Sequence, residues 1–256
     1  SDYGRSLAPK PDRTVYVSTV SIEPSPNGDM IAAAVGNRHD QELDLILLST
    51  KDGQVVRNLT KGLDKDRGYE YLTTPGGMRG NMVPWMSWSP VGDRLAYFVR
   101  TEKQHTLLIQ NVVSGKIEQR FDLKTVDGAE SPAFSPDGKT IAFSAMQGAV
   151  GDIFVLDLAT KSLTNVTKDA YADYAPTYAP DGKFLVYSTR ISGNDKLFQI
   201  DLASGQKKQI TFGTHDDEGP KFIDGHTIVF TSLATDPKVP LPPEVARNGN
   251  IPNVWT

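Results

Sequence analysis

A short turn motif recurs along this chain and constrains its fold more than any other feature. Residues 135–139 read Ser-Pro-Asp-Gly-Lys and residues 179–183 read Ala-Pro-Asp-Gly-Lys, and an aliphatic and aromatic run follows each. Looser copies occupy residues 25–29, 89–93 and 224–226. The glycines of successive copies are separated by 64, 46, 44 and 43 residues. Repeats of roughly this length that are rich in short strands are typical of β-propeller blades.

Residues 131–168 show the pattern of a single four-stranded blade. A short inner strand at 132–135 precedes the turn, and strands at 140–145, 152–158 and 163–167 follow it. The two middle strands are nearly continuous apolar runs, which indicates that both of their faces are covered. A strand inside a two-layer sandwich would show the same pattern, but the repeat favours blades that are covered by their neighbours.

We therefore expect an all-β protein, a β-propeller of four-stranded antiparallel blades with four full blades and a partial fifth. Residues 1–13 hold two prolines and are expected to form an extended N-terminal arm of the propeller at 14–256. Because an open ring leaves an exposed strand edge, the chain is interpreted as a fragment of a larger protein. The expected blades are residues 14–61, 86–122, 131–168, 174–212 and 218–256, with insertions at 62–85 and 233–252.

The composition excludes several classes of function. The chain has 27 Lys and Arg against 31 Asp and Glu, and no basic run, so we expect no nucleic-acid partner. No apolar stretch approaches about 18 residues, so no transmembrane segment is expected. The absence of cysteine excludes disulfides and thiolate metal sites without assigning a compartment.

The Ser-Pro-Asp-Gly-Lys turn and the strands after it resemble the TolB-like class of propellers. The segments that carry the resemblance include Asp-Ile-Phe-Val-Leu-Asp-Leu at 152–158 and Leu-Thr-Asn-Val-Thr at 163–167, and the likeness covers roughly residues 20–232. The Trp-Asp dipeptide of WD-type propellers does not occur. The resemblance implies six blades in the complete protein and a bacterial, periplasmic or otherwise extracytoplasmic scaffold that binds other proteins. Such a motif is specific for fold and nearly silent on function.

Three functions remain open at this point. The first is a non-catalytic scaffold that holds another protein or subunit in a larger extracytoplasmic assembly. The second is the propeller domain of a peptidase or other hydrolase whose catalytic domain is absent from this chain, since neither His-Glu-x-x-His nor Gly-x-Ser-x-Gly occurs in it. The third is a propeller that binds carbohydrate or a small ligand, for which Trp85 and Tyr174 are the candidate stacking surfaces. We expect no enzymatic activity from these residues alone.

The two insertions are expected on the same face of the propeller. The second, at 236–244, is dense in proline and should be extended and stiff, as a docking strap or as a plain loop. The first is rich in the residue types enriched in interface cores, although these side chains could equally pack over the propeller's own rim. The candidates for partner binding are Tyr69, Tyr71, Met78, Arg79, Met82 and Trp85.

Acidic residues recur just before the expected inner strands. Alignment of 169–176 with 213–220 superposes Asp173 on Asp217. Converging carboxylates at the channel mouth could hold a Ca²⁺-like cation or a basic partner, but bonds from each acid to its own turn are the favoured interpretation. The four histidines lack the spacing of metal ligands, so no metal or other cofactor is expected as a requirement. The polar candidates at the channel mouth are Glu130, Asp173, Tyr174, His215 and Asp217.

Overall fold

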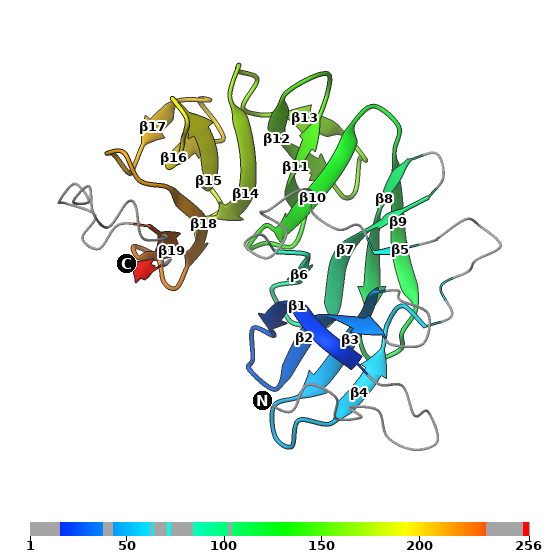
Figure 1. The fold of residues 1–256 in the computed structure, drawn as a ribbon. Coiled ribbons are helices and arrows are strands. Elements are labelled where there is room, and N and C mark those ends of the chain that lie inside the picture. The colour runs from blue at the N-terminus through cyan, green and yellow to red at the C-terminus, as the bar shows by residue number, and fades with distance from the viewer. Residues whose placement is uncertain are drawn as a thin grey trace. The chain divides into compact units, whose positions relative to one another are not determined.

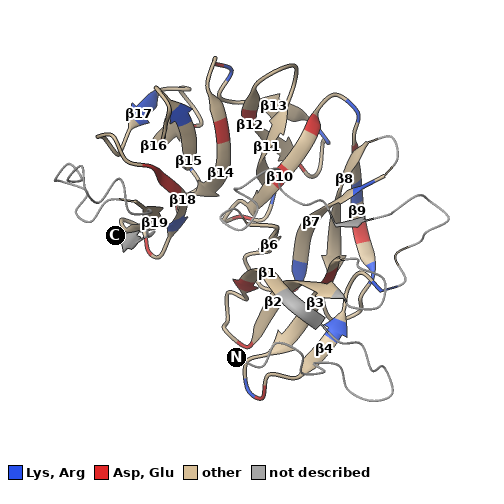
Figure 2. Cartoon of the chain, in the orientation of Figure 1, with Lys and Arg blue, Asp and Glu red and all other residues tan. Residues whose placement is uncertain are grey.

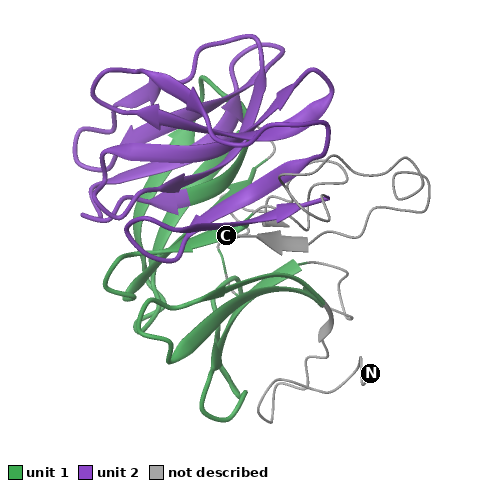
Figure 3. Ribbon diagram, turned by 90° about the vertical axis from the view of Figure 1, so that its left-hand side faces the viewer, with its two compact units in different colours: residues 1–132 green, residues 133–256 purple. Residues whose placement is uncertain are grey.

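The computed structural model describes residues 16–37, 43–61, 63, 71–72, 84–101, 104–233 and 253–255. Side chains are described for these residues except at 16–18, 37, 71–72 and 253–255. The chain divides into two compact units, residues 1–132 and 133–256, which Figure 3 colours separately. The expected arm at 1–13 and most of both insertions lie outside the described residues.

Unit 1 contains two antiparallel sheets. The first has the order β1 (Tyr16–Pro24), β2 (Met30–Asn37), β3 (Leu43–Ser49) and β4 (Val55–Asn58). The second runs through β7 (Arg94–Arg100), β8 (His105–Asn111) and β9 (Ile117–Leu123). Its inner position is shared by β5 (Tyr71–Leu72) and β6 (Met86–Trp88), which pair with opposite ends of β7.

Unit 2 continues the same design (Figure 1). The third sheet has the order β10 (Asp127–Phe134), β11 (Thr140–Met146), β12 (Gly151–Asp157) and β13 (Leu163–Asn165), with β10 starting in the last residues of unit 1. The fourth is β14 (Ala172–Tyr178), β15 (Phe184–Ile191), β16 (Asn194–Asp201) and β17 (Lys207–Gln209). The fifth is β18 (Asp217–Phe222), β19 (Ile228–Ser232) and β20 (Asn253–Trp255).

The predicted fold class is confirmed. The described elements are all strands, their pairings are antiparallel, and each sheet follows the chain order of a propeller blade. Four sheets have the full set of strand positions and the fifth has three strands. The inner strands begin earlier than the pattern predicts: β10 starts at Asp127, whereas the apolar signal starts at Pro132.

The recurrent turn is held by its own hydrogen bonds, which explains why its sequence returns. The Gly138 N–H donates to the Ser135 carbonyl at 2.9 Å, and the Ser135 hydroxyl donates to Asp137 Oδ1 at 2.7 Å. The same hydroxyl accepts the Thr140 N–H at 3.0 Å. Gly138 has a φ of 69°, a backbone conformation that costs glycine little and other residues more.

Continuous burial of the middle strands follows from packing on both faces. In β7, β8, β11 and β15, five consecutive residues are buried in each strand. In unit 1 one cluster joins Ala32 and Leu45 of the first sheet to Trp88 and Tyr97 of the second. The Trp88 indole N–H also donates to the Glu23 carbonyl at 2.9 Å, so the packing of the two sheets carries a directional contact.

Each inner strand of the last three sheets is bent at one repeated position. Ser131, Ala175 and Gly219 have positive φ values of 56°, 49° and 65°, and each directly precedes a proline. The strand register shifts at this point in β14 and in β18. A left-handed residue inside a strand is the signature of a bulge, which bends the strand and redirects the side chains beside it.

Two serines connect neighbouring sheets of unit 2 through the bent strands. The Ser144 hydroxyl of β11 donates to the backbone carbonyl of Asp173 in β14 at 2.9 Å. The Ser188 hydroxyl of β15 accepts the N–H of Gly219 in β18 at 3.1 Å. Each sheet therefore satisfies a backbone group of the inner strand that follows it.

Candidate functional site

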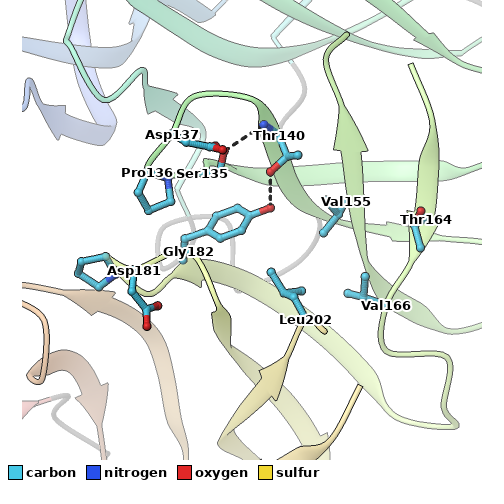
Figure 4. A pocket seen from close by; sticks show the side chains of 12 residues that line it. Ser135, Pro136, Asp137, Thr140, Val155, Thr164, Val166, Asp181, Gly182 and Leu202 are labelled. Carbon is cyan, nitrogen blue, oxygen red and sulfur yellow. Dashed lines mark hydrogen bonds between the residues drawn. The ribbon is translucent and has the colours of Figure 1, made fainter. Parts of the chain in front are cut away.

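A groove of about 650 Å³ lies in unit 2 between the third sheet of the chain (β10–β13) and the fourth (β14–β17), beside two of the recurrent turns (Figure 4). Tyr178 lines it, and its hydroxyl is 2.8 Å from the hydroxyl of Thr140. Burial raises the pKa of Tyr178 to about 12, so the phenol stays neutral at physiological pH. The apolar wall is formed by Val155, Val166 and Leu202, while the exposed rim holds Pro136, Asp137, Thr164, Pro180 and Asp181.

A cluster of buried charges lies elsewhere in unit 2. Figure 2 shows acidic residues on β14 and β18 and basic residues on β16 and β17. Asp152, Asp169 and Asp173 each place a carboxylate oxygen within 4.8 Å of the other two, an arrangement that could hold a metal ion. Asp152 and Asp173 are buried and Asp169 is half-buried.

Asp152 and Asp169 have hydrogen-bond partners. Asp152 accepts from the Asn165 amide at 2.7 Å and from the Thr167 hydroxyl at 3.2 Å. Asp169 accepts the Tyr171 N–H at 2.7 Å and lies 2.5 Å from the Lys207 ammonium. These contacts fix both carboxylates in place without filling all of their acceptor positions.

Asp173 differs from both of them. It is 1% exposed, and neither carboxylate oxygen accepts a hydrogen bond of normal geometry from the described residues. Burial raises its pKa to about 7, although the nearby hydroxyls of Thr189 and Thr167 act in the opposite direction. The carboxylate of Asp169 adds to the rise and Lys207 reduces it.

In the next sheet the equivalent acid is neutralised. The Asp217 carboxylate lies 2.8 Å from the Lys196 ammonium and accepts the Ser232 hydroxyl at 2.6 Å. His215 Nε2 lies 3.5 Å from the same carboxylate, and burial lowers the pKa of His215, which keeps the ring neutral. Tyr174, 3% exposed, donates to Glu218 at 3.1 Å.

The residues predicted for the channel mouth have different surroundings in the structure. Glu130 is half-buried in β10. Asp173 lies with Asp152 and Asp169, while Asp217 lies with Lys196 and His215. Asp173 lies in β14 and Asp217 is the first residue of β18. The Asp217 side chain contacts His215 of the preceding turn at 3.5 Å, and its hydrogen bonds are to Lys196 and Ser232.

Of the six partner-binding candidates, the structure describes the side chain of Trp85 alone. It is 6% exposed and belongs to the hydrophobic core of unit 1. Tyr71 begins β5, but its side chain is outside the described set, as are Tyr69, Met78, Arg79 and Met82 entirely. The role of these residues in binding stays a prediction.

Sequence reasoning missed Asp152, Asp169 and Lys196. The signal was present in the alignment of the third strands, where Asp152 and Lys196 occupy the same place, 44 residues apart like the turn glycines Gly138 and Gly182. The charge changes sign between Asp152 and Lys196, while the position of Asp173 and Asp217 stays acidic. This pattern indicates that the two repeat positions face each other.

The family model and the curated relatives that match this chain all carry the name TolB. The sequence profile of the family described as TolB beta propeller domain matches residues 68–240. A Tol-Pal system protein TolB from Gluconobacter oxydans is 30% identical over 135 residues, which cover 53% of this chain and 25% of that protein. A protein of the same name from Francisella tularensis is 30% identical over 89 residues, 34% of this chain and 20% of its own length. The matched segments thus span a quarter or less of these relatives.

Solved structures share the fold at lower identity. A putative TolB from Agrobacterium tumefaciens aligns with 76% of this chain and 65% of its own, with a TM-score of 0.58 and 19% identity. TolB from Acinetobacter baumannii aligns with 93% of this chain and 52% of its own, with a TM-score of 0.54 and 20% identity. A structure from a study of two prolyl endopeptidases covers 84% of this chain and 32% of its own, with a TM-score of 0.55 and 14% identity.

The described part of the chain contains no helix with the length and apolar character needed to cross a bilayer.

Proposed function

The chain belongs to the TolB beta propeller domain family, and from that premise we propose that it is a non-catalytic scaffold that binds another protein in an extracytoplasmic assembly. The observation that carries the proposal is the family match over residues 68–240, supported by two relatives that bear the name of a Tol-Pal system protein. On the same basis we propose a periplasmic location. Because the fold alone is compatible with many functions, the proposal depends on the family and not on the propeller as such.

We place the partner surface on the first insertion. Tyr69, Tyr71, Met78, Arg79 and Met82 are of the types that concentrate binding energy at interfaces. Trp85 is left out of this surface, because its side chain is packed in the core of unit 1 directly before β6. The groove beside Tyr178 is the second candidate surface, because its apolar wall and exposed rim would suit an extended segment of a partner.

The test is capture of a partner by the native full-length protein. The first probe is the Pal protein of the same organism, which the name of the Tol-Pal system associates with the relatives. It is immobilised and titrated with the propeller protein, and crosslinking with mass spectrometry then identifies the contact residues. We expect the combined replacement of Tyr71, Arg79 and Met82 by alanine to weaken capture at least about tenfold, as the loss of interface anchors does.

Two variants distinguish the surfaces. Thr164→Arg places a bulky charge on the rim of the groove, while Ser162→Arg places the same charge at an exposed position that does not line it. Loss of capture by Thr164→Arg alone would move the partner to the groove.

The rival function, a propeller domain serving a hydrolase, predicts a different result. The full-length protein would then cleave peptide substrates, and capture of a stable partner would fail. That outcome would end the scaffold proposal.

A further inference from the structure

Two consecutive third strands carry opposite charges at one position. Asp152 in β12 and Lys196 in β16 are both buried, at 7% and 2% exposure. In each case the next backbone N–H donates to a threonine hydroxyl at 3.0 Å, to Thr167 in the first and Thr211 in the second. The two side chains therefore start from equivalent backbone sites in equivalent surroundings.

At the Lys196 position of β16, the lysine ammonium is the cation that neutralises the neighbouring acid. Lys196 Nζ lies 2.8 Å from Asp217 Oδ2 and also donates to the backbone carbonyl of His215. The other oxygen of Asp217 accepts the hydroxyl of Ser232, its partner across the strand pair. The buried carboxylate of Asp217 is thus fully compensated.

At the Asp152 position of β12, by contrast, the neighbouring charged side chains are acids. Asp173 occupies the position of Asp217 and pairs across the strands with Thr189, as Asp217 does with Ser232. Asp173 is 1% and Thr189 3% exposed, and the described residues make no hydrogen bond of normal geometry to either Asp173 oxygen or to the Thr189 hydroxyl, although the Thr189 and Thr167 hydroxyls lie close enough to lower the pKa of Asp173. Buried polar groups are normally satisfied, so two orphaned groups beside one cluster point to a missing ligand.

The charge of the cluster defines that ligand. Asp152, Asp169 and Asp173 carry three negative charges when ionised, and the Lys207 ammonium, 2.5 Å from Asp169, offsets one. The remaining charge of −2 matches a divalent cation. Oxygen donors alone select a hard cation over a thiolate-seeking or imidazole-seeking one.

We propose that Asp152, Asp169 and Asp173 bind one Ca²⁺ ion where the following blade carries the ammonium of Lys196. Because the three ligand oxygens lie within 4.8 Å of one another, a common point lies within about 2.8 Å of all three, close to the Ca²⁺–oxygen range of about 2.3–2.6 Å. The Thr189 hydroxyl offers a neutral oxygen beside Asp173. Mg²⁺ is less suitable, because it requires near-octahedral geometry at about 2.1 Å and retains several waters.

The full chain, stripped with EDTA, tests the proposal by calorimetric titration with CaCl₂ and by thermal unfolding at each Ca²⁺ concentration. We expect one Ca²⁺ per chain with a dissociation constant of about 10⁻⁵ to 10⁻³ M, and binding of Mg²⁺ at least about tenfold weaker. Asp173→Asn should weaken Ca²⁺ binding roughly 100-fold, because it removes a charged ligand with little change of shape.

Two further variants test the assignment: a matched control, and a variant that replaces the proposed ion by a lysine. Asp44 accepts the Thr60 hydroxyl at 2.9 Å much as Asp152 accepts that of Thr167, so Asp44→Asn should leave Ca²⁺ affinity unchanged. Asp152→Lys recreates the arrangement of Lys196 with Asp217 and should give a folded protein whose melting temperature no longer responds to Ca²⁺.

Two results would overturn the site. One is the absence of saturable Ca²⁺ binding to the parent protein up to about 10 mM, well above the range in which such sites fill. The other is undiminished binding by Asp173→Asn, or by the less buried Asp169→Asn should Asp173→Asn fail to fold.

Discussion

Lys196 and Asp217 form an ion pair in the interior of unit 2, with 2.8 Å between Nζ and Oδ2 and side-chain exposures of 2% and 0%. Removal of one member leaves the other charge buried and uncompensated. Lys196→Met should therefore lower the free energy of unfolding by about 3 to 5 kcal/mol, measured by urea denaturation. The double variant Lys196→Met with Asp217→Asn should recover part of the loss, and an equal loss in both would contradict this account.

Asp173 should make the metal-free protein less stable as the pH rises. Its pKa is about 7 in the folded state and near 3.8 when unfolded, so between these values the folded state binds the extra proton. The free energy of unfolding should fall from pH 4 to pH 7 by as much as roughly 4 kcal/mol on this account. Burial is the main cause of the raised pKa of Asp173, the Thr189 and Thr167 hydroxyls oppose it, and of the charged neighbours Asp169 adds to the rise and Lys207 reduces it.

Urea denaturation in EDTA at pH 5 and pH 8 measures this slope. Asp173→Asn should remove this contribution. The free energy of unfolding of the variant, relative to that of the parent protein, should therefore be higher at pH 8 than at pH 5. The same change of stability with pH in both proteins would assign the slope to other groups.

Gly182→Ala should destabilise the protein by about 1 kcal/mol, because φ at this turn is +73° while the added methyl group meets Pro136 at an ordinary 3.8 Å. Gly225 is the matched control. It occupies the corresponding turn of the last copy, but its φ is not in the left-handed range and a Cβ there meets open space. Thermal unfolding should show a lower melting temperature for Gly182→Ala and nearly none of that change for Gly225→Ala.

Trp85→Ala should cost about 3 to 5 kcal/mol of stability, since the side chain is 6% exposed among core residues of unit 1. The sequence left two interpretations of Trp85 open, an anchor for a partner or packing over the propeller's own rim, and only the second predicts a large loss of stability. Tyr171→Ala, at a position 44% exposed, serves as the control and should change stability by less than about 0.5 kcal/mol. Equal melting temperatures for the two variants would place Trp85 outside the core.

The fold was predictable because its determinants are local. The turn at 135–139 closes through bonds among its own residues, so its sequence alone identifies it at each recurrence. The apolar runs of β11 and β15 likewise report burial on both faces. The last copy shows the limit of this reading, because Gly225 matches the motif in sequence but not in backbone conformation.

The charged sites were not predictable to the same degree, because their partners come from different strands. Asp173 meets Asp152, and Asp217 meets Lys196, only after neighbouring sheets have packed. The bend at Ala175, a non-glycine residue with φ of 49°, carries no turn signal in the sequence. An alignment of the acids alone therefore did not reveal that Asp173 and Asp217 have different partners.

The serine contacts of unit 2 bear on how that unit loses its structure. Ser144 holds the main chain of β14 and Ser188 that of β18, so the edge of one repeat is completed by the repeat before it. In an array whose stability resides in such nearest-neighbour terms, an excised repeat is left with unpaired polar groups and an uncovered apolar face. Unit 2 should accordingly melt as one cooperative block, with amide exchange in β11, β14 and β15 slowed to a common rate.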